Sequence, residues 1–209
     1  AVMMVGREVI PQAARSEAEP GEPVLRVKDL HVMSDFGTMA VKGVSFEVRA
    51  GEIFGIAGVE GNGQSELVQA ITGLRRPVKG EIWLRDRNVA GLGPRELYAL
   101  GLSHIPEDKS KFGLAMNFDL AENSLLGRQW EPQFAGTLGR LNWNNILNFA
   151  DYIVRAFNVV APGLRTPVKS LSGGNQQKLL VGRELSKEPS LVVAAHPTRG
   201  LDIASTVYI

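Results

Sequence analysis

Residues 58–65 place three glycines and a serine at a spacing that suits phosphate chemistry. The stretch reads Gly-Val-Glu-Gly-Asn-Gly-Gln-Ser, which follows the P-loop frame G-x-x-x-x-G-K-[ST] except that Gln64 stands in place of lysine. Glycines allow positive φ and let backbone N–H groups close around a phosphate, and the hydroxyl of Ser65 can bind Mg²⁺. The pattern predicts a nucleotide-phosphate site; the alternative is a strand–turn–helix corner that needs glycine only for geometry.

A second stretch, residues 171–177, also predicts an anion site at the start of a helix. It reads Leu-Ser-Gly-Gly-Asn-Gln-Gln. The Ser172 hydroxyl, two glycines that permit close approach and outward-pointing N–H groups would face a negatively charged ligand. The alternative is a serine-capped helix after a glycine turn, which explains Ser172 but not the whole string.

The two stretches, in this order and roughly 110 residues apart, resemble the P-loop and signature motif of ATP-binding cassette (ABC) ATPases. The resemblance implies ATP and Mg²⁺ as cofactors, with Ser65 on the metal. It assigns nucleotide binding to Phe36, Gly58, Gly61, Asn62, Gly63, Gln64, Ser65 and Glu66. It assigns the signature motif to Leu171, Ser172, Gly173, Gly174 and Gln176. In this family the signature meets ATP that is bound to the opposite subunit.

Three single residues acquire roles only through this resemblance. Phe36 stands where an aromatic ring stacks on adenine, although an ordinary apolar residue at a strand end is an equal alternative. Glu107 occupies the place of the family's Q-loop glutamine, and Asp202 matches the D-loop aspartate. Without the surrounding motifs, either carboxylate would be interpreted as a solvated loop residue.

Charged groups are missing from the nucleotide site. The Walker B strand of the family ends in Asp-Glu before Pro-Thr, but here Ala195 and His196 precede Pro197. A hydrogen bond to a charged group contributes about 1.5–3 kcal/mol, so the replacement of lysine by Gln64 alone predicts phosphate binding weaker by roughly one to two decades. An imidazole can act as a general base near neutral pH, but the loss of Mg²⁺ support at Ala195 favours a bystander role for His196.

The signature, by contrast, is intact, and this difference predicts an asymmetric role. Ser172, Gly173 and Gly174 would complete a partner domain's hydrolytic site, because ABC dimers are head-to-tail. The site around residues 58–65 would bind nucleotide weakly or hold it without turnover. This domain alone is therefore expected to hydrolyse ATP poorly.

Four strings resemble one branch of the family, the second ATP-binding domain of the tandem ATPases in simple-sugar and nucleoside importers. They are Gly58–Leu67, His104–Lys109, Leu171–Lys178 and Pro197–Asp202. The branch implies a peripheral position on the cytoplasmic face of the cell membrane. Its expected partners are the preceding ATP-binding domain of the same natural chain, membrane permease subunits and, indirectly, a substrate-binding protein.

The loop after Glu107, through Phe112 and Met116 to Asn123, is expected to face the permease subunits, with a plain surface loop as its alternative. Two other classes remain as alternatives to a transporter domain. One is a soluble ABC ATPase acting on ribosomes or DNA, which the net charge of +1 and the absence of a basic insertion disfavour. The other is a regulatory nucleotide-binding module without a transport partner.

The elements that must position these motifs can be placed from periodicity and turn residues. Residues 1–22 end in a polar, Pro- and Gly-bearing stretch and are interpreted as the tail of a preceding domain and a linker. The family resemblance implies that residues 23–209 form a truncated α/β ABC domain of the P-loop NTPase class. It would have a RecA-like core, an antiparallel β subdomain and a helical subdomain at about 106–180, and would be incomplete at its C-terminal end.

Apolar patterns within 23–209 predict individual elements. Alternating residues predict strands near 24–30 and 44–49, and short apolar runs predict strands buried on both faces at 53–57 and 191–195. Residues 82–84 and 102–105 are interpreted as further strands. Helices are expected at 64–73, at 94–101, from about 142 to 157 and at 175–186.

The overall composition excludes several kinds of chemistry. The chain has no cysteine, so disulfides and thiolate sites are excluded. His31, His104 and His196 do not have metal-ligand spacing, and no apolar run reaches the roughly 18 residues of a membrane span. With 44% hydrophobic and 22% charged residues, the chain is predicted to be globular.

Overall fold

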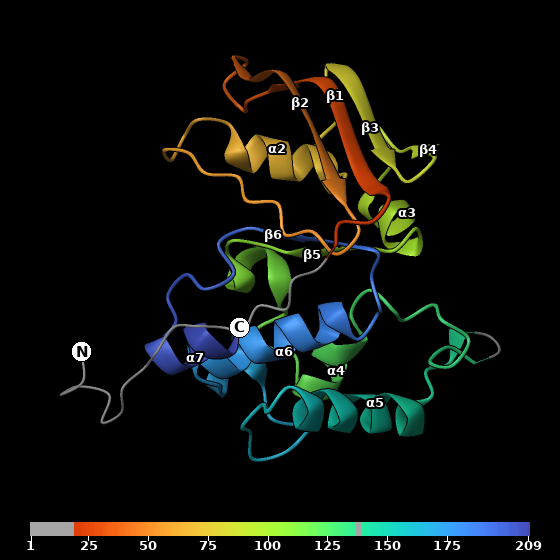
Figure 1. Ribbon diagram of the computed structural model, residues 1–209. Coiled ribbons are helices and arrows are strands. Elements are labelled where there is room, and N and C mark those ends of the chain that lie inside the picture. The colour runs from red at the N-terminus through yellow and green to blue at the C-terminus, as the bar shows by residue number, and fades with distance from the viewer. Residues whose placement is uncertain (1–18, 137–138) are drawn as a thin grey trace. The chain divides into compact units, whose positions relative to one another are not determined.

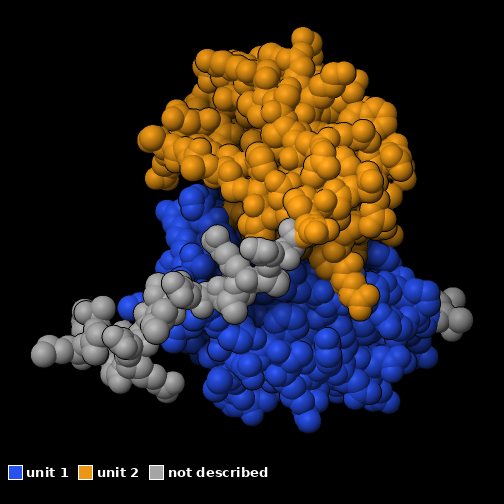
Figure 2. Space-filling view, in the orientation of Figure 1, with its two compact units in different colours: residues 1–16, 105–187, 196–209 blue, residues 17–104, 188–195 orange. Residues whose placement is uncertain are grey.

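The computed structural model describes residues 19–136 and 139–209. Most of the expected tail and linker, residues 1–22, therefore lies outside the described residues. The described residues form two compact units, which Figure 2 distinguishes by colour. Unit 2 comprises residues 19–104 and 188–195, and unit 1 comprises residues 105–187 and 196–209.

Unit 2 is built on a four-stranded sheet in the order β2-β1-β3-β4. β1 pairs antiparallel with both β2 and β3, and β4 continues antiparallel from β3. The strands are β1 (Pro23–Met33), β2 (Met39–Arg49), β3 (Lys79–Leu84) and β4 (Arg87–Asn88). The antiparallel sheet that the family resemblance implied is thus confirmed.

Helix α2 (Gln64–Ile71) covers one face of this sheet (Figure 1). It contacts β1 and β2, and its Leu67 and Ile71 are buried in one core with Leu30 and Ile82 of the sheet. A shorter helix, α3 (Pro94–Ala99), begins with proline at its first turn, as predicted. The helix that follows the P-loop is therefore anchored to the sheet by its apolar side.

A separate two-stranded sheet joins β5 (Leu102–Ile105) to β6 (Leu191–Ala194). The prediction that residues 191–195 are buried on both faces is wrong, because β6 alternates between half-buried and exposed residues. β5 is its one strand neighbour among the described residues. A strand needs neighbours and covering layers on both sides to be fully buried.

The prediction of a buried strand at residues 53–57 is also wrong. These residues form no strand, and Ile53 is 99% exposed. A central strand must pair its N–H and C=O groups with neighbouring strands, and the sheets of the described residues do not include this segment. Phe54 of this segment stacks on Phe46 of β2, with 5.1 Å between the ring centroids.

Unit 1 is mainly helical. Helices α4, α5 and α6 contact one another, and η1, a π-helix, contacts α6. The elements are η1 (Lys109–Gly113), α4 (Leu120–Leu125), α5 (Trp143–Ala156), η3 (Val168–Ser170), α6 (Gly173–Leu185) and α7 (Ile203–Tyr208). The predicted helices near 142–157 and 175–186 are confirmed, because they correspond to α5 and α6. In the described part of the chain, no helix is long and apolar enough to cross a membrane.

Candidate functional site

The P-loop segment ends at a helix that is capped by backbone alone. Gly63 is the N-cap of α2 with φ +92°, and no side chain in the described residues caps this helix. The N–H groups of the first helical residues, Gln64, Ser65 and Glu66, have no partner within the helix. These donors and the positive end of the helix dipole can bind an anion such as phosphate.

A Cβ would meet a close contact at two of the P-loop glycines, with the end of a flexible side chain at Gly58 and with the backbone at Gly63. A Cβ at Gly58 would lie 1.6 Å from Nε2 of Gln64, because the Gln64 side chain folds back over Gly58. A Cβ at Gly63 would lie 2.5 Å from the carbonyl oxygen of Ala40 in β2. Gly61 also has a positive φ, +88°, but open space around it. The glycines thus shape the loop and hold it against the sheet.

Two side chains in the first turn of α2 carry no positive charge. Gln64 offers a neutral amide, and Glu66 adds a carboxylate in the first turn of α2. The described residues contain no group of three or more acidic or histidine side chains that could hold a metal ion. Phosphate therefore fits the backbone donors, whereas Mg²⁺ would depend on the exposed Ser65 and on the phosphates themselves.

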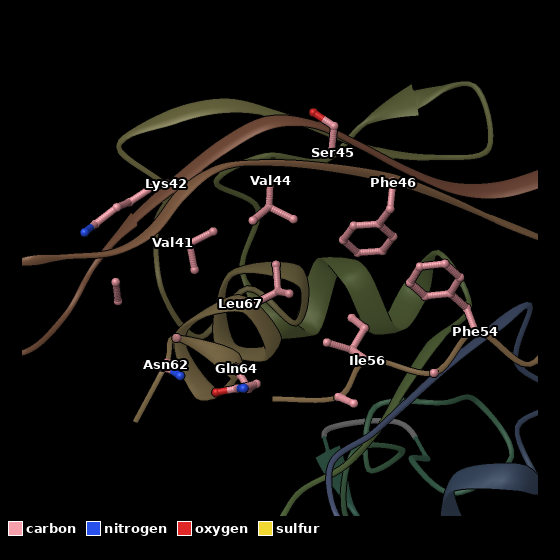
Figure 3. Close-up of a pocket in the computed structure, with 14 residues that line it drawn as sticks. Val41, Lys42, Val44, Ser45, Phe46, Phe54, Ile56, Asn62, Gln64 and Leu67 are labelled. Atoms are coloured by element: carbon pink, nitrogen blue, oxygen red, sulfur yellow. The ribbon is translucent and has the colours of Figure 1, made fainter. Parts of the chain in front are cut away.

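A hollow of about 450 Å³ lies beside the P-loop, between β2, α2 and the segment before the loop (Figure 3). Val41, Val44 and Phe46 of β2 point into it, opposite Leu67 and Ile56. Asn62 and Gln64 also line it, at the P-loop. The lining is of mixed polarity, and it includes one charged side chain, that of Lys42.

Phe36, the expected adenine-stacking residue, lies in the turn between β1 and β2. Its side chain is 94% exposed. Hydrogen bonds between Ser34 and Thr38 close the turn: the Thr38 carbonyl accepts from the Ser34 N–H at 2.7 Å, and the two hydroxyl oxygens lie 2.8 Å apart. The aromatic face of Phe36 is therefore available to a ligand from solvent.

In unit 1, two of the five signature residues are exposed and three, Leu171, Gly174 and Gln176, are buried. Ser172 caps α6 by accepting from the N–H of Asn175, and both Ser172 and Gly173 are exposed. Gly174 is buried, and a Cβ there would lie 2.3 Å from Oγ of Ser205. Gln176 is also buried and donates to the carbonyls of Val168 and Leu171, at 3.2 Å each. Its side chain holds the turn before the helix.

Asp202, the predicted D-loop residue, caps α7. Its carboxylate accepts from Oγ of Ser205 at 2.7 Å and from the Ser205 N–H at 2.9 Å. The hydroxyl hydrogen bond, followed by the backbone one, lowers the pKa of Asp202 from its ordinary value. Asp202 therefore remains charged and fixes Ser205 against the buried glycine of the signature.

The predicted Q-loop carboxylate, Glu107, forms an ion pair with Arg199. Arg199 lies in the turn that follows His196, and its N–H donates to the His196 carbonyl at 3.0 Å. His196 itself is exposed and has a left-handed backbone, with φ +47°. The structure therefore joins Glu107 to the Pro-Thr-Arg-Gly turn rather than leaving it as a solvated carboxylate.

The expectation that residues up to Asn123 face a partner is wrong at Asn123. Its side chain is fully buried. The Asn123 amide oxygen accepts from the N–H of Ala115 at 2.9 Å, and the amide nitrogen donates to the Ala115 carbonyl at 3.0 Å. Phe112 in η1, by contrast, is 64% exposed. The accessible part of this segment therefore includes η1 and, after it, Asn117 and Phe118.

Sequence reasoning missed a buried charged cluster on α6 and just after it, composed of Arg183, Glu184 and Lys187. Glu184 accepts from Arg183 Nε at 3.0 Å and from Lys187 Nζ at 2.6 Å. Burial lowers the pKa of Lys187 to about 8. Helical spacing was the available signal, because positions 176, 180, 183 and 187 share one face and the first two lie in the core.

Comparisons with known proteins identify the family to which the chain belongs. The ABC transporter family model matches residues 41–199. The chain is 41% identical to the guanosine import ATP-binding protein NupO of Bacillus subtilis, and 40% identical to the nucleoside import ATP-binding protein NupA of Lactococcus lactis. Each alignment covers 100% of this chain and 41% of the relative. A glucose import ATP-binding protein of Haloferax volcanii is 40% identical over 98% of this chain and 38% of its own length.

Solved structures show the same fold. A dimeric ATP-binding cassette bound to ADP and phosphate has a TM-score of 0.73 and 22% identity, over 88% of this chain and 79% of that chain. A nucleotide-free cassette from an ABC transporter has a TM-score of 0.68 and 21% identity, over 88% and 73%. The chain spans about two fifths of the length of the curated relatives it matches. It belongs to the ABC transporter family and has the P-loop ATPase fold of an ATP-binding domain homologous to those of nucleoside and sugar import systems.

Proposed function

We propose that this chain is the second ATP-binding domain of a tandem ATPase that powers nucleoside import, with simple sugars as the second substrate class. Of the three relatives described above at 40–41% identity, two are named for guanosine and nucleoside import and one for glucose import, which supports the order of these classes. In the proposal, the chain works with another ATP-binding domain, permease subunits and a substrate-binding protein. It acts at the cytoplasmic face of the membrane.

One contrast within the chain carries the proposed mechanism. The P-loop of unit 2 offers backbone donors but has the neutral Gln64 beside the acidic Glu66. The signature of unit 1 presents Ser172 and Gly173, capped and exposed, at the start of a 13-residue helix. The signature is thus suited to the phosphates of a partner's ATP, while the chain's own site binds nucleotide weakly and turns it over poorly.

The contact with the permease is proposed to lie at η1. Phe112 is exposed there, and Lys111 Nζ lies 5.0 Å from the centre of its ring, so an apolar surface carries a positive charge. The chain has no cysteine, so Phe112→Cys provides a single crosslinking group. A crosslink to a permease subunit is expected in the assembled transporter. The absence of a crosslink from Phe112 and from several neighbouring exposed positions would contradict this contact.

The division between the two sites can be tested with one variant in each. Gly173→Asp places a carboxylate at the first position of α6, where the helix dipole favours it and where a Cβ meets nothing closer than 3.9 Å. Folding should therefore be retained, but a partner's phosphate would be repelled. Turnover of the assembled transporter is expected to fall at least tenfold.

The matched variant is Gln64→Ala, which alters this chain's own P-loop. It is expected to leave turnover of the assembled transporter within about twofold, because the proposal assigns hydrolysis to the partner's P-loop. The reverse pattern, with Gly173→Asp tolerated and Gln64→Ala inactive, would overturn the proposal. ATP hydrolysis by the isolated chain at the rate of the assembled transporter would overturn it as well.

A further inference from the structure

The short segment between Glu107 and Gly113 is held at both ends by arginine side chains. At its start, Glu107 pairs with Arg199. At its end, the carbonyl of Gly113 accepts from Arg183 Nη2 at 2.8 Å. Between these points the chain forms η1, whose first turn is capped by the Asp108 carboxylate. The segment is thus fixed rather than free at its two termini, although it carries the exposed Phe112.

Arg183 contacts more than this one segment. Its side chain is almost fully buried, and Nη1 lies 3.4 Å from the carbonyl oxygen of Asn123 in α4, while Nε donates to Glu184. One guanidinium therefore joins three elements, α6, η1 and α4. A lysine could not make these contacts together, because its single ammonium lacks the planar fork of arginine.

Packing at Gly113 brings η1 into direct contact with α6. A Cβ at Gly113 would lie 3.0 Å from Cδ2 of Leu180 and 3.3 Å from Cγ of Pro106. Leu180 is fully buried, so it has little room to move away. The end of η1 therefore rests on α6 through both an apolar contact and a charge-assisted hydrogen bond.

We propose that Arg183 is a positioning residue that makes η1 and α6 move as one body. A displacement of η1 at Phe112 would then move the start of α6, where Ser172 and Gly173 lie, instead of being absorbed by the intervening loops. Arg183 does not touch nucleotide in this proposal; it acts through the helix. The consequence for transport rests on the proposed function, because it requires a permease that binds η1.

The coupling itself can be tested on the chain without any partner. Spin labels at Phe112→Cys and Leu185→Cys would report the distance between η1 and the exposed end of α6, and no natural cysteine interferes. One narrow distance distribution is expected with Arg183 present. Arg183→Lys keeps the charge but loses the fork, and is expected to broaden the distribution or add a second distance.

A second variant keeps the test decisive if Arg183→Lys does not fold. Gly113→Ala retains every charged group but pushes η1 away from Leu180, so it is expected to shift the same distance. The control is Arg155→Lys, which changes an exposed arginine of α5 whose ion-pair partner, Asp151, lies on the same helix. Unchanged distributions in folded Arg183→Lys and in Gly113→Ala would overturn the inference.

The experiments distinguish a failure of the coupling between η1 and α6 from a failure of the proposed permease contact. If Phe112→Cys crosslinks to the permease but the spin-label distances do not change in Arg183→Lys, the coupling is wrong and the permease contact stands. If the distances respond to Arg183 but no exposed position of η1 crosslinks, the coupling stands and the proposed contact is wrong. In the assembled transporter, the coupling predicts that Arg183→Lys lowers substrate-stimulated turnover at least fivefold more than does Arg155→Lys.

Discussion

Nε2 of Gln64 lies only 1.6 Å from the position that a Cβ of Gly58 would occupy, so the end of the Gln64 side chain folds over the first glycine of the P-loop and would have to shift if this glycine gained a side chain. This loop departs from the P-loop frame at position 64, where a neutral amide stands in place of the charged lysine.

Gln64→Lys is accordingly expected to raise the affinity of the chain for ATP roughly ten- to hundredfold. A hydrogen bond that involves a charged group is worth about 1.5–3 kcal/mol, and the gain should shrink as salt is added. Calorimetric titration with MgATP measures it. Gln64→Met, which is similar in length but uncharged, is the control, and equal affinities of the lysine and methionine variants would contradict the argument.

Gly63 and Gly61 form a matched pair for testing the contact between the P-loop and β2. Both have positive φ, but a Cβ at Gly63 meets the Ala40 carbonyl at 2.5 Å, whereas Gly61 has open space. Gly61→Ala should cost about 1–2 kcal/mol through left-handed backbone strain alone. Gly63→Ala should cost about 1–3 kcal/mol more, because α2 or β2 must shift. Urea unfolding compares the two, and equal losses would show that the close approach is not rigid.

Asn123 is predicted to be a structural residue of unit 1. In Asn123→Leu, the N–H and carbonyl of Ala115 lose the partner that the amide provides, and the side chain is fully buried. We expect a loss of about 3 kcal/mol in the free energy of unfolding. The exposed Asn117, changed to leucine as a control, should alter it by less than about 0.5 kcal/mol. A loss for Asn123→Leu as small as that of the control would contradict the structural role.

The sequence predicted features that depend on local chemistry. Asn142 and Ser172 begin α5 and α6 because a polar side chain next to a helix satisfies the first free N–H groups. The P-loop and signature strings were recognisable for a similar reason, since each encodes its own turn and helix start. Local capping and turn residues need no knowledge of distant parts of the chain.

Features that depend on distant partners could not be predicted in this way. The apolar run at 53–57 has the composition of a buried strand, yet its burial requires neighbouring strands that no local pattern specifies. The burial of the polar side chains of Asn123 and Arg183 is a similar case. It depends on the carbonyl groups that surround these side chains in the folded chain, and no local pattern identifies those carbonyls. The sequence placed Glu107 in its motif but did not predict its ion pair with Arg199, because the two residues are 92 positions apart.

Lys187 makes the stability of the chain depend on pH in an unusual direction. Burial lowers its pKa to about 8, against 10.5 for the free side chain, even though Glu184 raises it. Below pH 8 the lysine is charged in both the folded and the unfolded chain. Between about pH 8 and 10.5 the folded chain has released this proton and the unfolded chain has not, so unfolding takes up a proton and the folded state gains stability as the pH rises.

The expected gain is on the order of 3 kcal/mol across this window, since each pKa unit corresponds to about 1.4 kcal/mol. Lys187→Met removes the group, so the stability of the wild-type chain relative to this variant should rise from pH 8 to 10.5. Urea unfolding at several pH values measures the difference. Arg155→Met changes an exposed cation on α5 and should give a difference that stays flat. A relative stability of wild type that falls with pH would mean that the lysine is charged in the folded chain throughout this range, held there by Glu184.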